Sequence, residues 1–102
     1  MRIVSINTNG IRAAARKGFF EWLEASNADV VCIQETKAQE ADLDDSFRPD
    51  GWHVAFKSAL KKGYSGTAIY SRRAPQRIDD TLGYPEFDDE GRYLAFVFED
   101  VT

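Results

Sequence analysis

The spacing of apolar residues predicts a β-α-β unit at the start of the chain. Residues 3–6 and 30–33 are short, almost continuous apolar runs, which is typical of strands buried on both faces of a sheet. Between them, after an Asn-Gly turn, apolar side chains recur at helical spacing, at Ile11, Ala15, Phe19, Trp22 and Leu23. A right-handed crossover makes the two strands of such a unit parallel, so their carboxyl ends should lie at one edge of the sheet.

The rest of the chain predicts one further helix and three further strands. The helix is expected at about 39–47, and strands at 52–57 and 65–71 flank a Lys-Lys-Gly connection. A loop rich in Asp, Gly and Pro then leads to a last strand at 92–99. The pattern contains no repeat, low-complexity tract or interdomain linker. We therefore expect residues 1–102 to belong to a single α/β domain.

Composition is that of a soluble folded unit, with 43% hydrophobic and 29% charged residues. No apolar run approaches the length of about 20 residues that a membrane-spanning helix needs, and the first residues lack the features of a signal peptide. The single cysteine, Cys32, lies inside an apolar run. It predicts a reduced core thiol and a cytoplasmic location.

The net charge of −4 argues against non-specific coating of nucleic acid, but the charges are segregated. Acidic residues group at 40–50, 79–80 and 86–90. Basic residues cluster elsewhere, at Arg12, Arg16 and Lys17, at Lys57, Lys61 and Lys62, and at Arg72, Arg73 and Arg77. A local basic face on an acidic protein is one interpretation, and ordinary solvated surface is the alternative for each cluster.

Asn7 and Glu35 each lie just past the end of one of the first two predicted strands. Their side chains should emerge at the same edge of the sheet, and strands about 4.8 Å apart would allow one ion or phosphate to touch both. Carboxylate and amide oxygens are hard ligands of the kind that Mg²⁺ prefers, and Mg²⁺ often binds through only one or two carboxylates. The alternative for Glu35 is a solvated residue at the start of a helix.

The first predicted helix carries its charges in an unusual order. Arg12, Arg16 and Lys17 stand near its start and Glu21 and Glu24 toward its end, which is the reverse of what the helix dipole favours. A phosphate bound by these bases would explain this order. A solvated surface, on which each reversed charge costs only a few tenths of a kcal/mol, is the alternative.

Four segments in order give the chain a resemblance to a known family. They are Val4 to Ala13 (VSINTNGIRA), Cys32 to Lys37 (CIQETK), Lys62 to Gly66 (KGYSG) and Asp89 to Arg92 (DEGR). Together they resemble the exonuclease III family of abasic-site endonucleases. The resemblance implies the N-terminal half of a four-layer α/β sandwich, with a mixed β-sheet flanked by helices. The chain would then be a single incomplete domain.

The resemblance also implies roles for particular residues. Asn7 matches the family's active-site asparagine, Glu35 its metal-binding glutamate, and Tyr64 the tyrosine that approaches the scissile phosphate. Asn7 is also a candidate metal ligand. The residues expected to contact the DNA backbone are Arg12, Lys62 and Arg92. The implied reaction is Mg²⁺-dependent hydrolysis of DNA, with Mn²⁺ as a substitute, 5′ to an abasic site or at a 3′ end.

The family's later catalytic aspartates, asparagine and histidine find no match here, and Asn9 stands where some branches carry a metal-binding aspartate. His53, the only histidine, matches no catalytic position. We therefore expect the isolated chain to bind Mg²⁺ weakly and not to cleave DNA. A non-catalytic DNA-binding or assembly module, or a phosphatase branch of the same superfamily, remains an alternative.

The expected partner is double-stranded DNA with abasic sites or 3′ ends, and no membrane. A sheet with one uncovered apolar face should also associate with another surface, either the C-terminal half of the fold or a second copy of the chain. The residues expected to be buried in a homodimer are Ile3, Val31, Ile69 and Phe96.

Overall fold

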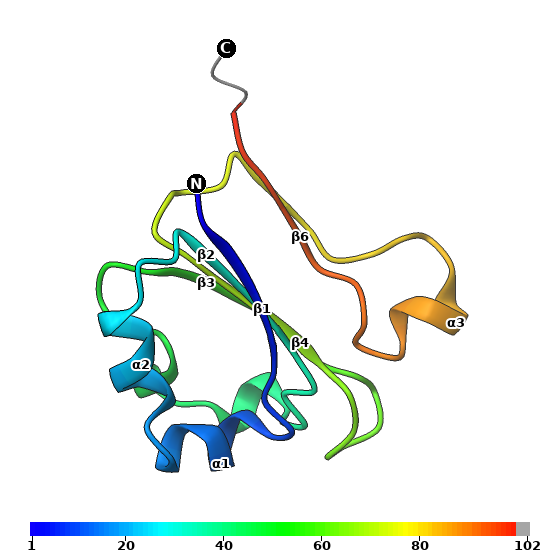
Figure 1. Ribbon diagram of the computed structural model, residues 1–102. Coiled ribbons are helices and arrows are strands. Elements are labelled where there is room, and N and C mark those ends of the chain that lie inside the picture. Colours follow the sequence, from blue (N-terminus) through cyan, green and yellow to red (C-terminus); the bar gives the residue numbers. More distant parts are fainter. Residues whose placement is uncertain (100–102) are drawn as a thin grey trace.

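The computed structural model describes residues 1–99 and has α/β architecture (Figure 1). Its elements, in chain order, are β1 (Ile3–Asn7), α1 (Ile11–Arg16), α2 (Phe19–Ala25), β2 (Val30–Gln34), the 3₁₀ turns η1 (Glu40–Asp42) and η2 (Asp45–Phe47), β3 (His53–Lys57), β4 (Thr67–Ser71), β5 (Arg77–Asp79), α3 (Pro85–Asp88) and β6 (Ala95–Val97). No helix within these residues is long and apolar enough to cross a bilayer.

The main sheet has four strands in the order β1-β2-β4-β3. β1 and β2 are parallel neighbours, with Asn7 opposite Gln34, whereas β4 runs antiparallel to both β2 and β3. The sheet is therefore mixed, as predicted, and the β-α-β unit is confirmed. Its parallel pair brings the ends of β1 and β2 to the same edge.

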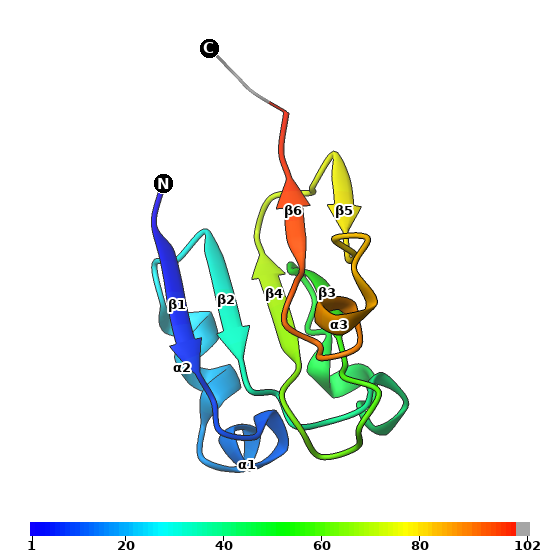
Figure 2. The same ribbon diagram turned by 90° about the vertical axis from the view of Figure 1, so that its right-hand side faces the viewer.

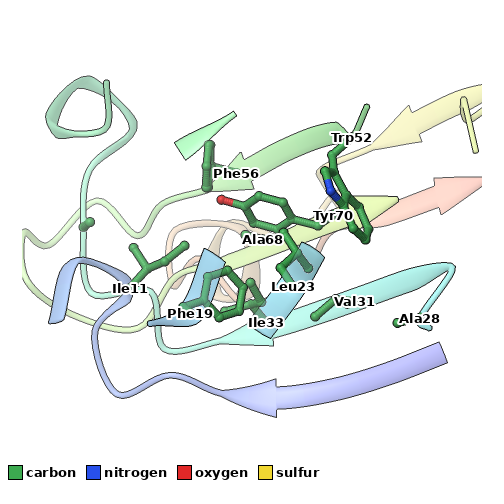
Figure 3. Packing of buried hydrophobic residues seen from close by; sticks show 11 residues of the cluster. Ile11, Phe19, Leu23, Ala28, Val31, Ile33, Trp52, Phe56, Ala68 and Tyr70 are labelled. Carbon is green, nitrogen blue, oxygen red and sulfur yellow. The ribbon is translucent and has the colours of Figure 1, made fainter. Parts of the chain in front are cut away.

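The two N-terminal helices cover one face of this sheet and close the hydrophobic core (Figures 1 and 3). Ile11, Leu23 and Tyr70 are fully buried in the core. The predicted single helix is interrupted at Gly18, whose left-handed φ of 100° separates α1 from α2. Only glycine adopts this conformation readily, so the bend is encoded at one residue.

The prediction of a helix at about 39–47 is wrong. That segment forms the two 3₁₀ turns η1 and η2, and the Asp44 side chain accepts hydrogen bonds from the Ser46 backbone and hydroxyl. Aspartate and serine compete with the helical backbone in this way. The carboxylate of Asp44 has its pKa lowered mainly by the Ser46 side-chain hydrogen bond.

The last predicted strand is shorter than expected, because β6 pairs only with the three residues of β5. The loop predicted to precede it contains β5 and α3, which the pattern did not predict. The β5-β6 ribbon and α3 lie on the side of the main sheet opposite α1 and α2 (Figures 1 and 2).

An apolar hollow of about 340 Å³ lies between the main sheet and β6. Ile3, Cys32, Ile69 and Phe96 line it, whereas Val31 is buried under the helices. Placing Val31 on the uncovered face was therefore wrong, because side chains alternate along β2 and Val30 and Cys32 take that face. Burial also raises the pKa of the Cys32 thiol.

Candidate active site at the carboxyl edge of the sheet

Asn7 and Glu35 meet at the carboxyl edge of the parallel strands, as the β-α-β pattern predicts. The Asn7 side-chain amide donates a hydrogen bond to Glu35 Oε2. Its oxygen, Oδ1, accepts one from the backbone N–H of Asn9 over 2.9 Å, which fixes which way the amide points. Asn7 therefore orients the Glu35 carboxylate.

The backbone around Glu35 is held in an uncommon conformation. Glu35 has a left-handed φ of 54°, as do Asn9, Lys37 and Ser65 at 46°, 52° and 51°. Such strain in non-glycine residues persists only where surrounding contacts impose it, and it concentrates at functional sites. Here the Glu35 carbonyl accepts from the backbone N–H of Gly10 over 2.8 Å and from the Thr8 hydroxyl over 3.1 Å.

A third loop is joined to the same edge by backbone hydrogen bonds. Thr36 N–H donates to the Gly66 carbonyl over 3.1 Å, and Lys37 N–H donates to that of Ser65 over 2.7 Å. This loop carries Tyr64. The segments after β1 and β2 and before β4 are thus fixed relative to one another.

Lys37 is a member of this site that the sequence interpretation did not single out, although it ends the Gln-Glu-Thr-Lys segment. Its Nζ lies 2.5 Å from Asn9 Oδ1 and 3.7 Å from Glu35 Oε1. The ammonium group partly neutralises the carboxylate. Both Lys37 and Glu35 have a left-handed backbone, which a residue pattern does not show.

Tyr64 and Arg92 come from distant parts of the chain and lie in contact. Arg92 Nη2 donates to the Tyr64 hydroxyl oxygen over 2.8 Å, and the Tyr64 hydroxyl donates to Glu90 Oε1 over 2.7 Å. The hydrogen bond to Tyr64 is the main cause that raises the pKa of Arg92, and the carboxylates of Glu90 and Glu35 raise it further. Glu90 is a second residue that the predicted site did not include.

Three of the predicted site residues line one open hollow of about 460 Å³. They are Glu35, Tyr64 and Arg92, and the other lining residues are Lys37, Gly63 and Ser65. Arg12 and Arg16 line a separate hollow of about 330 Å³. Lys37 borders both hollows. Lys62 is exposed in the turn beside Gly63 and lines neither.

The oxygen donors at this edge fit a hard divalent cation that keeps most of its water. The Glu35 side chain is 44% exposed, and Asn7 occupies only one of its oxygens. The Asn7 oxygen keeps a second lone pair for a ligand. Within residues 1–99, no group of three or more His, Cys, Asp or Glu side chains is placed to hold a metal ion.

Solved structures of AP endonucleases share the fold of this chain. The catalytic domain of Xenopus laevis APE2 aligns with a TM-score of 0.78 and 33% identity, over 92% of this chain and 38% of that one. An AP endonuclease from Archaeoglobus fulgidus aligns with a TM-score of 0.73 and 32% identity, over 87% of this chain and 35% of that one.

Residues 4–102 match the endonuclease/exonuclease/phosphatase family, and the chain belongs to that family. It is 42% identical over 102 residues to an exodeoxyribonuclease of Bacillus subtilis, covering 99% of this chain and 40% of that protein. It is 33% identical over 99 residues to a DNA-(apurinic or apyrimidinic site) endonuclease of Dictyostelium discoideum, covering 97% of this chain and 27% of that protein. The chain thus spans less than half the length of these relatives.

Proposed function

We propose that this chain carries the metal-binding and DNA-backbone-binding part of a Mg²⁺-dependent nuclease of the exodeoxyribonuclease III type. Its substrate would be duplex DNA, hydrolysed at abasic sites or 3′ ends. The observation that carries the proposal is the hollow shared by Glu35, Tyr64 and Arg92, with Asn7 orienting Glu35. A carboxylate for a cation and a guanidinium for a phosphate suit a phosphodiester bound through a metal.

Each residue takes a role that its position supports. Glu35, with a lone pair of Asn7 as a possible second donor, would hold Mg²⁺ or Mn²⁺, which when bound polarises the phosphate. Tyr64 and Arg92 would contact a phosphate oxygen at the same hollow. Arg12 and Lys62 would extend the DNA contact as positioning charges that do not read sequence.

We also propose that these residues alone bind DNA without hydrolysing it. Removing a single group that stabilises a transition state can cost about two to three orders of magnitude in rate. The described residues place one carboxylate, Glu35, on the shared hollow. A DNA-binding module without a metal requirement is the second candidate, because the basic residues would serve it equally well.

We also propose a reducing location and an association surface for this chain. The half-buried Cys32 suits a reducing compartment such as the cytoplasm. The face carrying the apolar hollow between the main sheet and β6 would take either a second copy of the chain or further polypeptide of the same fold.

Binding of a fluorescently labelled abasic-site duplex tests the proposal. Substituting Arg12, Lys62 or Arg92 by glutamine should weaken binding and reduce the slope of log K against log salt by about 1 for each phosphate that is no longer neutralised. Arg77→Gln, on the β5-β6 ribbon, is the matched control and should leave the slope unchanged. Equal effects of all four changes would contradict a localised DNA site, and binding unaffected by Mg²⁺ would favour the non-catalytic module.

A further inference from the structure

Glu90 joins Tyr64 and Arg92 into one hydrogen-bonded cluster. A tyrosine hydroxyl has one hydrogen to donate and lone pairs with which to accept. In this structure the hydrogen goes to Glu90 Oε1 over 2.7 Å, and the oxygen accepts from Arg92 Nη2 over 2.8 Å. The direction of the first bond therefore leaves the Tyr64 oxygen available to Arg92.

We propose that Glu90 is a positioning residue, which sets the Tyr64 hydroxyl and through it holds the Arg92 guanidinium toward a DNA phosphate. The inference rests on the proposed function, because it assigns a role within the same DNA-binding hollow. Glu90 itself would not contact DNA. Its carboxylate also lies 3.7 Å from Arg92 Nη2, so a direct ion pair accompanies the shorter route through the Tyr64 hydroxyl.

Backbone packing around Gly91 holds the segment with Glu90 and Arg92 close to Tyr64. Gly91, between Glu90 and Arg92, has a φ of 65°, and a Cβ there would lie 2.4 Å from the Ala59 backbone nitrogen. Leu60 N–H donates to the Asp89 carbonyl over 2.9 Å. The segment that carries Glu90 and Arg92 is therefore packed directly against the loop that leads to Tyr64.

Arg92 keeps enough donors and exposure to bind a ligand. A guanidinium has five N–H donors, and the contact with Tyr64 uses one. The Arg92 side chain is 59% exposed, and it borders the hollow that Glu35 also lines. The cluster thus restrains the Arg92 side chain and leaves most of its N–H donors available to a ligand.

Charge repulsion alone predicts that removing Glu90 strengthens DNA binding, whereas a positioning role predicts that it weakens binding. An acidic side chain beside a DNA-binding surface repels phosphate, so its removal should strengthen binding. If Glu90 positions Arg92, its removal should weaken binding instead. The sign of the change therefore separates the two explanations.

The test compares binding of an abasic-site duplex by Glu90→Ala, Glu90→Gln and Glu86→Ala. Glu90→Ala should weaken affinity about threefold to tenfold, the size expected for one net hydrogen bond. Glu90→Gln keeps an acceptor for the Tyr64 hydroxyl and should stay within about twofold of the wild type. Glu86→Ala, which removes a nearby exposed acid on α3, should bind equally or more tightly.

The single variant Tyr64→Phe and the double variant Tyr64→Phe/Glu90→Ala complete a double-mutant cycle. If Glu90 acts through Tyr64, the double variant should be no weaker than the worse single variant. Two results would overturn the positioning role of Glu90 and leave the proposed function unaffected. One is that the losses of affinity in the double variant are additive. The other is that Glu90→Ala binds as tightly as the wild type while Arg92→Gln weakens binding. Arg92→Gln binding like the wild type would count against the proposed function itself.

A measurement without DNA keeps the inference testable on its own. Nuclear magnetic resonance relaxation of Arg92 Nε should show a more mobile side chain in Glu90→Ala and in Tyr64→Phe than in the wild type or Glu86→Ala. Thermal unfolding of each variant checks that the fold is retained. An equally ordered Arg92 in folded Glu90→Ala would overturn the positioning role whatever the DNA result.

Discussion

At the scale of single residues, Gly66 controls how closely the Tyr64 loop approaches the Glu35 loop. A Cβ at this position would lie 2.1 Å from Thr36 Oγ1, which is far inside the van der Waals separation. The Gly66 carbonyl also accepts from Thr36 N–H. Thr36 is buried, so it has little room to move away.

We expect Gly66→Ala to separate the two loops and to lower the free energy of unfolding by about 2 to 4 kcal/mol, from left-handed backbone strain plus overpacking. Gly83→Ala is a matched control, because Gly83 has the same φ of 92° and a Cβ there would meet no atom within 4 Å. It should cost only the strain, about 1 kcal/mol. Urea unfolding of both variants measures the difference, and an equal destabilisation of both would show that crowding against Thr36 has no effect.

Sequence reasoning reached some site residues and missed others for a physical reason. Asn7 and Glu35 were predictable because strand ends of a β-α-β unit share an edge. Lys37 and Glu90 were not, since their contacts depend on left-handed backbone and on loops that pack against each other. The roles of all these residues in binding metal and DNA stay predictions.

At the scale of elements, Tyr70 on β4 connects the sheet to the turn η2. Its hydroxyl donates to the Phe47 carbonyl over 2.6 Å, and its ring packs edge-on against Phe19, Phe20 and Phe56. Burial raises the pKa of Tyr70 well above its ordinary value, against a smaller opposing effect of Arg48.

The raised pKa of Tyr70 makes the free energy of unfolding depend on pH in the alkaline range. A pKa raised in the folded state means that the stabilisation is complete below about pH 10, the pKa of an unfolded tyrosine, and is lost as pH rises above it. Tyr70→Phe should cost about 1 kcal/mol at pH 7 and should lose less further stability between pH 9 and about 11 than the wild type. Tyr84→Phe, at an exposed site, should match the wild type. Urea unfolding across that pH range measures the effect. An equal fall in the free energy of unfolding of the wild type and of Tyr70→Phe would contradict a role for Tyr70 ionisation.

The apolar runs that form the main sheet were predicted well, and the elements of three or four residues were not. β1, β2 and β3 lie where their apolar runs indicated, and β4 begins at Thr67, later than expected. β5 and α3 have three and four residues and depend on tertiary contacts, which no local pattern encodes. The 3₁₀ turns replaced a helix because Asp44 and Ser46 satisfy each other locally.

At the scale of the whole molecule, the helices protect one face of the sheet and leave apolar residues exposed on the other side. Ile3 is 63% exposed and Met1 70% exposed, and both border the hollow beside β6. An extended apolar surface of this kind favours association.

We expect light scattering at micromolar concentration to report a dimer or a larger species. Phe96→Asp, which places a charge in this hollow, should unfold or precipitate the chain. Phe87→Asp is the control, because Phe87 is 53% exposed on α3 and does not line the hollow. A dispersed monomer that tolerates Phe96→Asp would rule out association through this face.

The most direct test of the proposed site is to locate a paramagnetic ion on the chain. Mn²⁺ added at sub-stoichiometric amounts should broaden the backbone amide signals around Asn7, Glu35 and Thr36, with a dissociation constant in the millimolar range, about that of sites with few charged ligands. Glu35→Gln should abolish the broadening, and Glu86→Gln should not. Broadening centred on the acidic segment 86–90, or unchanged in Glu35→Gln, would contradict a metal site at the carboxyl edge of the sheet.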